Sequence, residues 1–181
     1  MSQSRLFTPI LVGGCLILLI NFALRASFGV FQIPVAETFG WPRAEFSLAI
    51  AIQNLAWGFL QPLAGALTVR YGFRPIMVVG ALAYIAGLVL MTTAHGLVSI
   101  MIGAGVLIGI SLACTANAIA MSVAARAVPE MARSTVLGIV SAAGSLGALL
   151  SAPIGQMLNE GFGWRVGLAG FVILSVGMIP A

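Results

Sequence analysis

The sequence predicts an all-α membrane protein in which about six apolar segments cross a bilayer. Hydrophobic residues make up 61% of the 181 residues and charged residues 7%, whereas a soluble domain carries about 25% charged residues. So few charges cannot cover a surface that faces water, and the mean hydropathy of +1.15 indicates lipid as the main solvent. The apolar runs lack the alternation of a membrane β-barrel, and an open sheet would leave backbone groups unpaired in lipid, so we expect helices.

The positions of the charged residues divide the chain into spans. A helix needs about 20 apolar residues to cross a hydrocarbon core of roughly 30 Å. The charge-free run 75–125 is too long for one crossing, and the short polar turn at residues 92–96 is its natural break. The six predicted spans are residues 7–32, 46–69, 76–94, 98–124, 134–158 and 166–181. The last is the shortest, at about 24 Å of helix, so we expect the chain to be a fragment of a longer protein.

The arginines predict the orientation of these spans. Five of the eight fall at one end of the layout, namely Arg5, Arg70, Arg74, Arg126 and Arg133. Arg43 and Arg165 fall at the other end. Because cytoplasmic loops of membrane proteins are enriched in Lys and Arg, this distribution places the N-terminus in the cytoplasm. We expect an integral protein of the plasma (inner) membrane.

Several classes of protein are excluded by the composition. The pI near 10.1 comes from single, scattered arginines, which do not form the basic stripe of a nucleic-acid-binding protein. Cys15 and Cys114 lie inside apolar runs and are interpreted as small core residues. No Cys/His spacing indicates a metal, and nothing indicates a cofactor. No Ser/His, Asp/Asp or His/Glu constellation is placed to run an enzyme within the spans.

Arg25 is the charged residue inside the predicted spans. It shares one helical face with Asn21, Phe28 and Gln32, because the four residues recur at intervals of four, three and four. A charge at such a position is costly and normally faces a cavity or a partner. Arg25 could instead extend to the outer headgroups. We favour an anion site, because all four glutamates are predicted in loops or at interfaces and none can neutralise it.

The amides of the other spans can be interpreted in two ways, and the small residues predict helix packing. Gln53, Asn54, Gln61 and Asn117 could form hydrogen bonds between helices or line a cavity, and the sequence leaves both open. The GxxxG pair Gly105 and Gly109 predicts close helix packing. The same packing is predicted for a ridge of small residues in the fifth span, formed by Gly138, Ser141, Ser145, Ala148 and Ala152.

The segment 65–74 resembles the cytoplasmic signature of the major facilitator superfamily, G-x-L-x-D-R-x-G-x-[RK]. It matches at Gly65, Leu67, Arg70, Gly72 and Arg74. It departs at Val69, where the superfamily usually has Asp, so the contact of that Asp in closing the inner gate is in doubt here. The resemblance implies that Gly65, Arg70, Gly72 and Arg74 belong to a cytoplasmic gate loop.

Residues 22–31 resemble the first helix of monocarboxylate porters and their oxalate/formate-type relatives, which carry a basic residue where Arg25 stands. Residues 69–80 and 162–165 are similar to other segments of the same branch. The resemblance implies an N-terminal six-helix half, made of 3+3 inverted repeats, of a carrier with 12 helices. Arg25 would then pair with a substrate carboxylate near Asn21, Gln53, Asn54 and Asn117. A proton or a counter-anion would offset the charge, and the C-terminal half would supply the remaining ligands.

The hypothesis for function is therefore secondary active transport of a small organic anion by alternating access. Its expected partners are that anion, the lipid bilayer and the missing C-terminal half, and nucleic acid is not among them. A carrier of a neutral or cationic substrate, in which Arg25 is a structural partner, is one alternative. A non-transporting six-span scaffold or subunit is the other.

Overall fold

The computed structural model describes residues 9–115 and 117–178, and nearly all of them are helical. The first three helices are α1 (Pro9–Phe39), α2 (Arg43–Tyr71) and α3 (Phe73–Thr92). A fourth helical segment consists of α4 (Leu97–Ile100), the π-helical turn η2 (Met101–Leu107), α5 (Ile108–Cys114) and α6 (Asn117–Arg126). The short helix η3 (Glu130–Ala132) leads into α7 (Arg133–Val176). The described residues contain no strand, so the predicted all-α fold class is confirmed.

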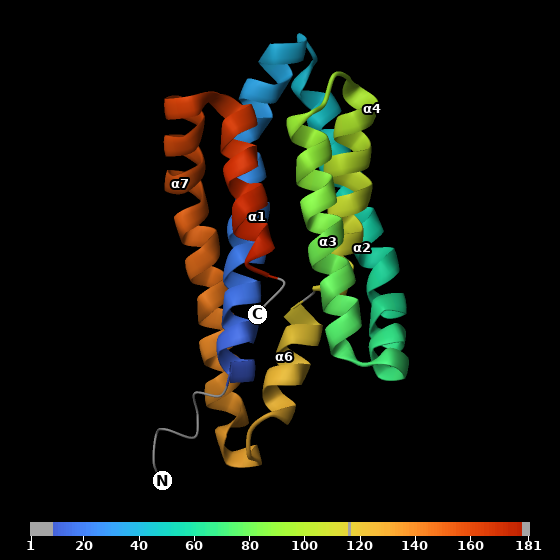
Figure 1. Ribbon diagram of the computed structural model, residues 1–181, viewed down its shortest axis with the longest axis vertical. Helices are drawn as coiled ribbons and strands as arrows, with labels where there is room; N and C mark the ends of the chain where they lie inside the picture. The colour runs from blue at the N-terminus through green and yellow to red at the C-terminus, as the bar shows by residue number, and fades with distance from the viewer. Residues whose placement is uncertain (1–8, 116, 179–181) are drawn as a thin grey trace.

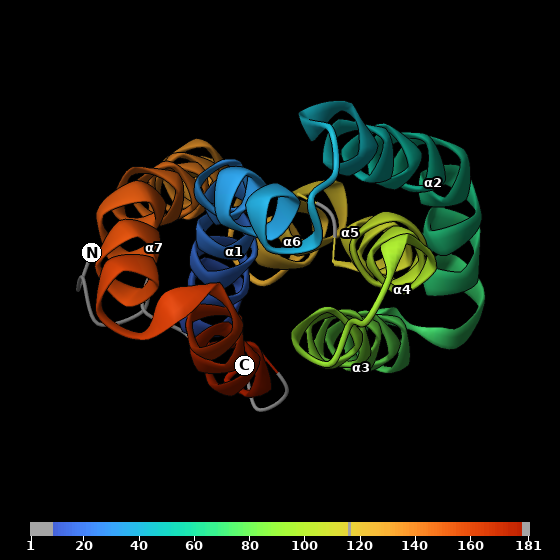
Figure 2. The ribbon, with the colours of Figure 1, turned by 90° about the horizontal axis from the view of Figure 1, so that it is seen from above.

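The helices run along the long axis of the molecule (Figure 1). The start of α1 and the links α2–α3 and α6–α7 lie at one end, and the links α1–α2 and α3–α4 lie at the other. Within α7 the chain doubles back, because Gly163 adopts φ 80° and ψ 163° and breaks the helix. Such a positive φ is accessible to glycine at little cost. Seen from above, α2 and α3 gather around the α4–α5 segment, whereas α7 lies against α1 (Figure 2).

Four helical segments of the described chain are long and apolar enough to cross a membrane. They are Leu11–Phe39, Phe73–Thr92, Leu97–Arg126 and Glu130–Val176. The last of them includes the reversal at Gly163. Helix α2 has 29 residues but is not among the four, and its amides at positions 53, 54 and 61 lower its hydropathy. The count of six spans therefore stays a prediction.

The helix ends differ from the predicted spans in three places. Helix α1 continues to Phe39, past the predicted end at residue 32. The predicted span 98–124 is irregular, because a π-helical turn occupies Met101–Leu107 and α5 ends at Cys114. The helix of the last predicted span, 166–181, is described to Val176, and residues 179–181 lie outside the described part. The turn predicted at residues 92–96 coincides with the gap between α3 and α4.

The largest buried cluster joins all the long helices near the C-terminal half of α1. It combines aromatic and aliphatic side chains from α1, α2, α3, the α4–α5 segment and the end of α7. Its largest fully buried members include Phe31, Tyr84, Leu88, Met91 and Ile108. This cluster positions the middle of α1 against α2 and α3, which carry residues of the candidate site.

The predicted close packing of Gly105 and Gly109 is confirmed. A Cβ atom on Gly105 would lie 3.2 Å from the carbonyl oxygen of Ala49, and one on Gly109 would lie 2.9 Å from that of Gln53. Both glycines thus allow the fourth helical segment to approach the backbone of α2.

The ridge predicted in the fifth span does not pack against another helix of the described chain. Gly138, Ser141, Ser145 and Ala152 are exposed within the described chain and Ala148 is half-buried. Helix α7 instead approaches α1 through the neighbouring stripe of Gly144, Gly147, Ser151 and Gly155, all buried. Small residues line both stripes of α7, so residue size alone could not identify the contacting one.

Candidate functional site

Arg25 lies half-buried on α1 and contacts two side chains of α2. Its Nη2 donates a hydrogen bond to Oδ1 of Asn54 at 2.9 Å. Its guanidinium carbon lies 4.6 Å from the ring centroid of Trp57, in a cation–π arrangement. Asn54 and Trp57 are three residues apart on α2 and therefore share a face. The structure thus brings together two of the predicted site residues, Arg25 and Asn54.

The Asn54 amide is itself held in one orientation. Its Nδ2 donates to the backbone oxygen of Ile50 at 2.9 Å, which leaves Oδ1 to accept from Arg25. Since Oδ1 is a neutral acceptor, it orients the guanidinium without cancelling its charge. Asn54 is exposed within the described chain, so this face of the site is open.

No carboxylate neutralises Arg25 within residues 9–115 and 117–178. The ion pair formed there joins Arg133, the first residue of α7, to Glu130 of η3 at 3.9 Å. Glu37 and Glu160 are exposed in helix-end regions, as the sequence predicts. No group of His, Cys, Asp and Glu in these residues could hold a metal ion. The local charge at Arg25 is therefore positive and uncompensated.

Two aromatic side chains near Arg25 hold buried polar atoms without partners. Tyr84 of α3 is completely buried, and its Oη makes no hydrogen bond within the described chain. The Nε1 atom of Trp57 is likewise buried and makes no hydrogen bond there. Unpaired buried donors cost about 1–3 kcal/mol each. Neither Trp57 nor Tyr84 is among the predicted site residues, and Tyr84 lies in an apolar run that gives no signal for it.

Asn21 and Gln53 are used in contacts between helices. Nδ2 of Asn21 donates to Oγ1 of Thr115 at 2.6 Å, and Nε2 of Gln53 donates to the backbone oxygen of Ala104 at 3.0 Å. Both side chains are buried. These contacts favour the interpretation that Asn21 and Gln53 form hydrogen bonds between helices. A role of either residue in substrate binding stays a prediction. The side chain of Asn117 lies outside the described part of the structure.

The predicted gate loop is a tight turn between α2 and α3. Gly72 has φ 87° and ψ 165°, and its backbone nitrogen donates to the oxygen of Thr68 at 2.9 Å. Residues other than glycine rarely adopt this φ. The backbone conformation of the turn therefore explains why the signature has a glycine at this position. Arg70 and Arg74 are exposed at this end, and Arg70 lies 5.2 Å from the ring of Tyr71.

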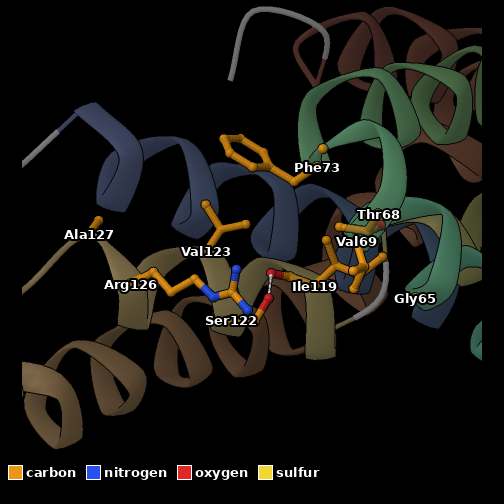
Figure 3. Close-up of a pocket in the computed structure, with 10 residues that line it drawn as sticks. Gly65, Thr68, Val69, Phe73, Ile119, Ser122, Val123, Arg126 and Ala127 are labelled. Carbon is orange, nitrogen blue, oxygen red and sulfur yellow. Dashed lines mark hydrogen bonds between the residues drawn. The ribbon is translucent and has the colours of Figure 1, made fainter.

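A cavity of about 560 Å³ adjoins this turn, between the end of α2, the start of α3 and α6 (Figure 3). Its lining from α2, α3 and their turn is Gly65, Thr68, Val69, Gly72 and Phe73. Its lining from α6 and the residue after it is Ile119, Ser122, Val123, Arg126 and Ala127. The side chain of Arg126 extends along the cavity toward Ser122 (Figure 3).

The opposite end of the bundle is fastened by the segment after Gly163. Nε1 of Trp164 donates to Oγ1 of Thr38 at 2.8 Å. Arg165 donates to the backbone oxygens of Thr92 and Ala94, both at 3.0 Å, and its guanidinium lies 4.7 Å from the ring of Trp164. The second half of α7 is therefore tied to the ends of both α1 and α3.

Curated relatives of the chain are membrane transporters. Monocarboxylate transporter 3 of Mus musculus is 28% identical over 159 residues, which are 87% of this chain and 32% of that protein. Monocarboxylate transporter 11 of Mus musculus is 31% identical over 153 residues, 81% of this chain and 32% of that protein. The MFS-type transporter eupM of Phoma sp is 26% identical over 158 residues, 85% of this chain and 55% of that protein.

The chain thus spans about a third of the length of both monocarboxylate transporters. The family model described as Major Facilitator Superfamily matches residues 14–181. This match includes the first helix with Arg25 and the turn at Gly72, on which the resemblance rested. The relatives and the family are transporters rather than enzymes. The chain belongs to the major facilitator superfamily.

Proposed function

We propose that the chain is the N-terminal half of a secondary active transporter for a small organic anion of the monocarboxylate type. The observation that carries this proposal is the uncompensated guanidinium of Arg25, held by Asn54 and Trp57. The superfamily match and the names of the monocarboxylate transporters support it. In the proposed mechanism the carrier binds the anion between its halves and exposes it to each side of the membrane in turn.

The geometry suits a carboxylate. Asn54 occupies one N–H of the guanidinium, and the remaining N–H groups can donate to two carboxylate oxygens at once. The indole of Trp57 shields one face of the guanidinium without neutralising it. An arriving anion then exchanges its hydration shell for charge-assisted hydrogen bonds, which are stronger than neutral ones.

The proposal also covers the partners and the orientation. A proton or a counter-anion would offset the substrate charge in the return step, and the missing C-terminal half would supply further ligands. We infer that this half alone does not transport, because one half cannot enclose a site that lies between two. The grouping of Arg70, Arg74, Arg126 and Arg133 near the end where α1 begins supports a cytoplasmic N-terminus in the plasma (inner) membrane.

Uptake of radiolabelled monocarboxylates by the full-length protein tests the role of Arg25. We expect Arg25→Ala to lower the uptake efficiency, kcat/KM, about 10–100-fold, because charge-assisted hydrogen bonds contribute about 1.5–3 kcal/mol. The uptake efficiency of Arg25→Lys should lie between those of the parent protein and Arg25→Ala, since an ammonium keeps the charge but not the bidentate geometry. Arg133→Gln is the matched control, because Arg133 is exposed at the start of α7, away from Arg25.

Unchanged uptake and apparent affinity in Arg25→Ala would contradict the anion site. The alternative carrier of a neutral or cationic substrate has one observation in its favour, since Asn54 and Trp57 give Arg25 partners within the chain. Competitors of equal size and different charge separate the two hypotheses. Inhibition by anions alone supports the proposal, whereas inhibition by neutral or cationic analogues supports the alternative.

A further inference from the structure

The cavity beside the gate turn is separate from the Arg25 site. The two share α2, but Asn54 and Gly65 are eleven positions apart in the chain, which is about 16 Å along a helix. The volume of about 560 Å³ lies within the range of pockets that hold small molecules, about 300–1,000 Å³. The proposed substrate site does not include this cavity, so what the cavity can bind must be considered separately.

The lining combines an apolar wall with one cation. Thr68 and Ser122 each donate their hydroxyl to a carbonyl oxygen of their own helix, those of Ala64 and Ile119, both at 2.8 Å. The hydroxyl hydrogens of Thr68 and Ser122 are therefore already engaged in hydrogen bonds within the helices. No Asp or Glu is among the described lining residues, so the guanidinium of Arg126 gives the cavity a positive charge.

Val69 is a second residue that determines the net charge of the cavity lining. It lines the cavity together with Arg126, at the position where the superfamily signature usually has Asp. An aspartate at this position would add a negative charge to the same lining as the guanidinium. Valine makes the wall apolar and leaves the positive charge uncompensated. The departure from the signature thus changes what the cavity can hold.

We propose that this cavity binds an anionic phospholipid, with its phosphate on Arg126 and its acyl chain against the wall of Val69, Phe73 and Val123. An amphiphile with one negative head and an apolar tail matches both parts of the lining. Basic pockets between membrane helices on the cytoplasmic side are typical sites of anionic lipid headgroups. The inference rests on the proposed orientation, in which this end faces the cytoplasmic leaflet, and it does not depend on the substrate of the Arg25 site.

The test uses the full-length protein in nanodiscs of phosphatidylcholine with increasing phosphatidylglycerol. Bound lipid is counted by native mass spectrometry after release, and thermal unfolding is followed in parallel. We expect one retained phosphatidylglycerol that raises the unfolding temperature. Arg126→Gln and Val69→Asp should each lower its retention at least tenfold, and Arg126→Lys should keep most of it.

Two matched controls lie at the same end but outside the cavity. Arg133→Gln removes a cation, and Met131→Asp adds a carboxylate at a residue that is 84% exposed. Both should retain the lipid as the parent protein does. Equal retention in Arg126→Gln and the parent would overturn the proposal. Equal protection by inorganic phosphate would also overturn it, since a free anion would then suffice.

Protein occupancy of the cavity is a further outcome. If a cysteine at position 69 cross-links to another part of the full-length protein regardless of lipid content, that segment fills the cavity and the lipid proposal is wrong. Uptake measured with Arg25→Ala is read separately from lipid retention. Failure of the anion site would therefore leave the lipid result intact, and the reverse also holds.

Discussion

At the scale of single residues, the orientation of Arg25 is set by neutral groups. The Asn54 amide is tied to Ile50 and accepts one N–H, while the indole of Trp57 lies 4.6 Å from the guanidinium carbon. A carboxylate in either position would pair with the arginine and compete with an incoming anion. An amide and an aromatic ring restrict the rotamer and leave the charge available.

Substitution of Trp57 tests this positioning role. We expect Trp57→Leu to raise the KM for the anion about 2–5-fold with a smaller effect on kcat, because a cation–π contact contributes about 0.5–1 kcal/mol at a partly exposed site. Trp57→Phe keeps an aromatic face and should recover most of the affinity. Uptake kinetics of the full-length protein in proteoliposomes measure both constants. Equal KM values for the two variants would show that the ring acts only by filling space.

The candidate site could be predicted only in part from the sequence. Arg25 is evident because it is a charge within an apolar run, and Asn54 because it is an amide in another. Gln53 is equally polar, but a helix turns about 100° per residue, so its side chain bonds to Ala104 instead. Tyr84 gave no signal, since an isolated tyrosine in an apolar helix does not reveal whether its hydroxyl is paired.

At the scale of helices, the fourth segment is shaped by its glycines. A Cβ atom on Gly109 would lie 2.6 Å from Cβ of Ala56 and 2.9 Å from the oxygen of Gln53. Around Gly138 of α7, by contrast, nothing lies within 4 Å of an added Cβ. The chemical change from Gly to Ala is identical at both positions, so any difference in stability reports the helix contact.

Thermal unfolding of these two variants in detergent measures the contact. We expect Gly109→Ala to lower the unfolding temperature, because overpacking typically costs about 1–3 kcal/mol. Gly138→Ala should leave it unchanged or raise it slightly. An equal effect of both substitutions would contradict the close approach of α5 to α2.

Helix positions were more predictable than helix faces. Charges and the turn at residues 92–96 locate the helix boundaries, since lipid tolerates neither charged residues nor unpaired backbone groups. In α7, small residues occur on two neighbouring stripes, and only tertiary packing selects the one with Gly144 and Gly147. The reversal at Gly163 coincides with a predicted loop between spans, but its φ of 80° required the structure.

At the scale of the whole molecule, the two ends of the bundle differ in charge and in packing. The end with the gate turn carries most of the arginines and holds the cavity of Figure 3. The other end is closed by aromatic side chains, with Phe39 and Trp41 stacked at 4.4 Å and Trp164 beside them. Placed in a cell membrane, these ends would face different compartments.

Cysteine labelling determines which end is outside. In a variant with both native cysteines replaced, we introduce either Phe162→Cys or Met131→Cys, at residues that are 69% and 84% exposed. We expect a membrane-impermeant maleimide to label the first in intact cells and the second only after permeabilisation, as the arginine distribution predicts. The reverse pattern would place the N-terminus outside and would remove the basis for a cytoplasmic lipid site.

The hydrogen bonds that fasten the end opposite the gate turn also set an order of assembly. Trp164 and Thr38 are 126 positions apart, and Arg165 lies 73 positions after its acceptor Thr92. Chains are synthesised from the N-terminus, so α1 and α3 enter the membrane long before the groups that tie their ends together exist. Until then, the carbonyl oxygens of Thr92 and Ala94 lack the hydrogen bonds that Arg165 donates to them. The first helix to be made is thus among the last to be fixed in place.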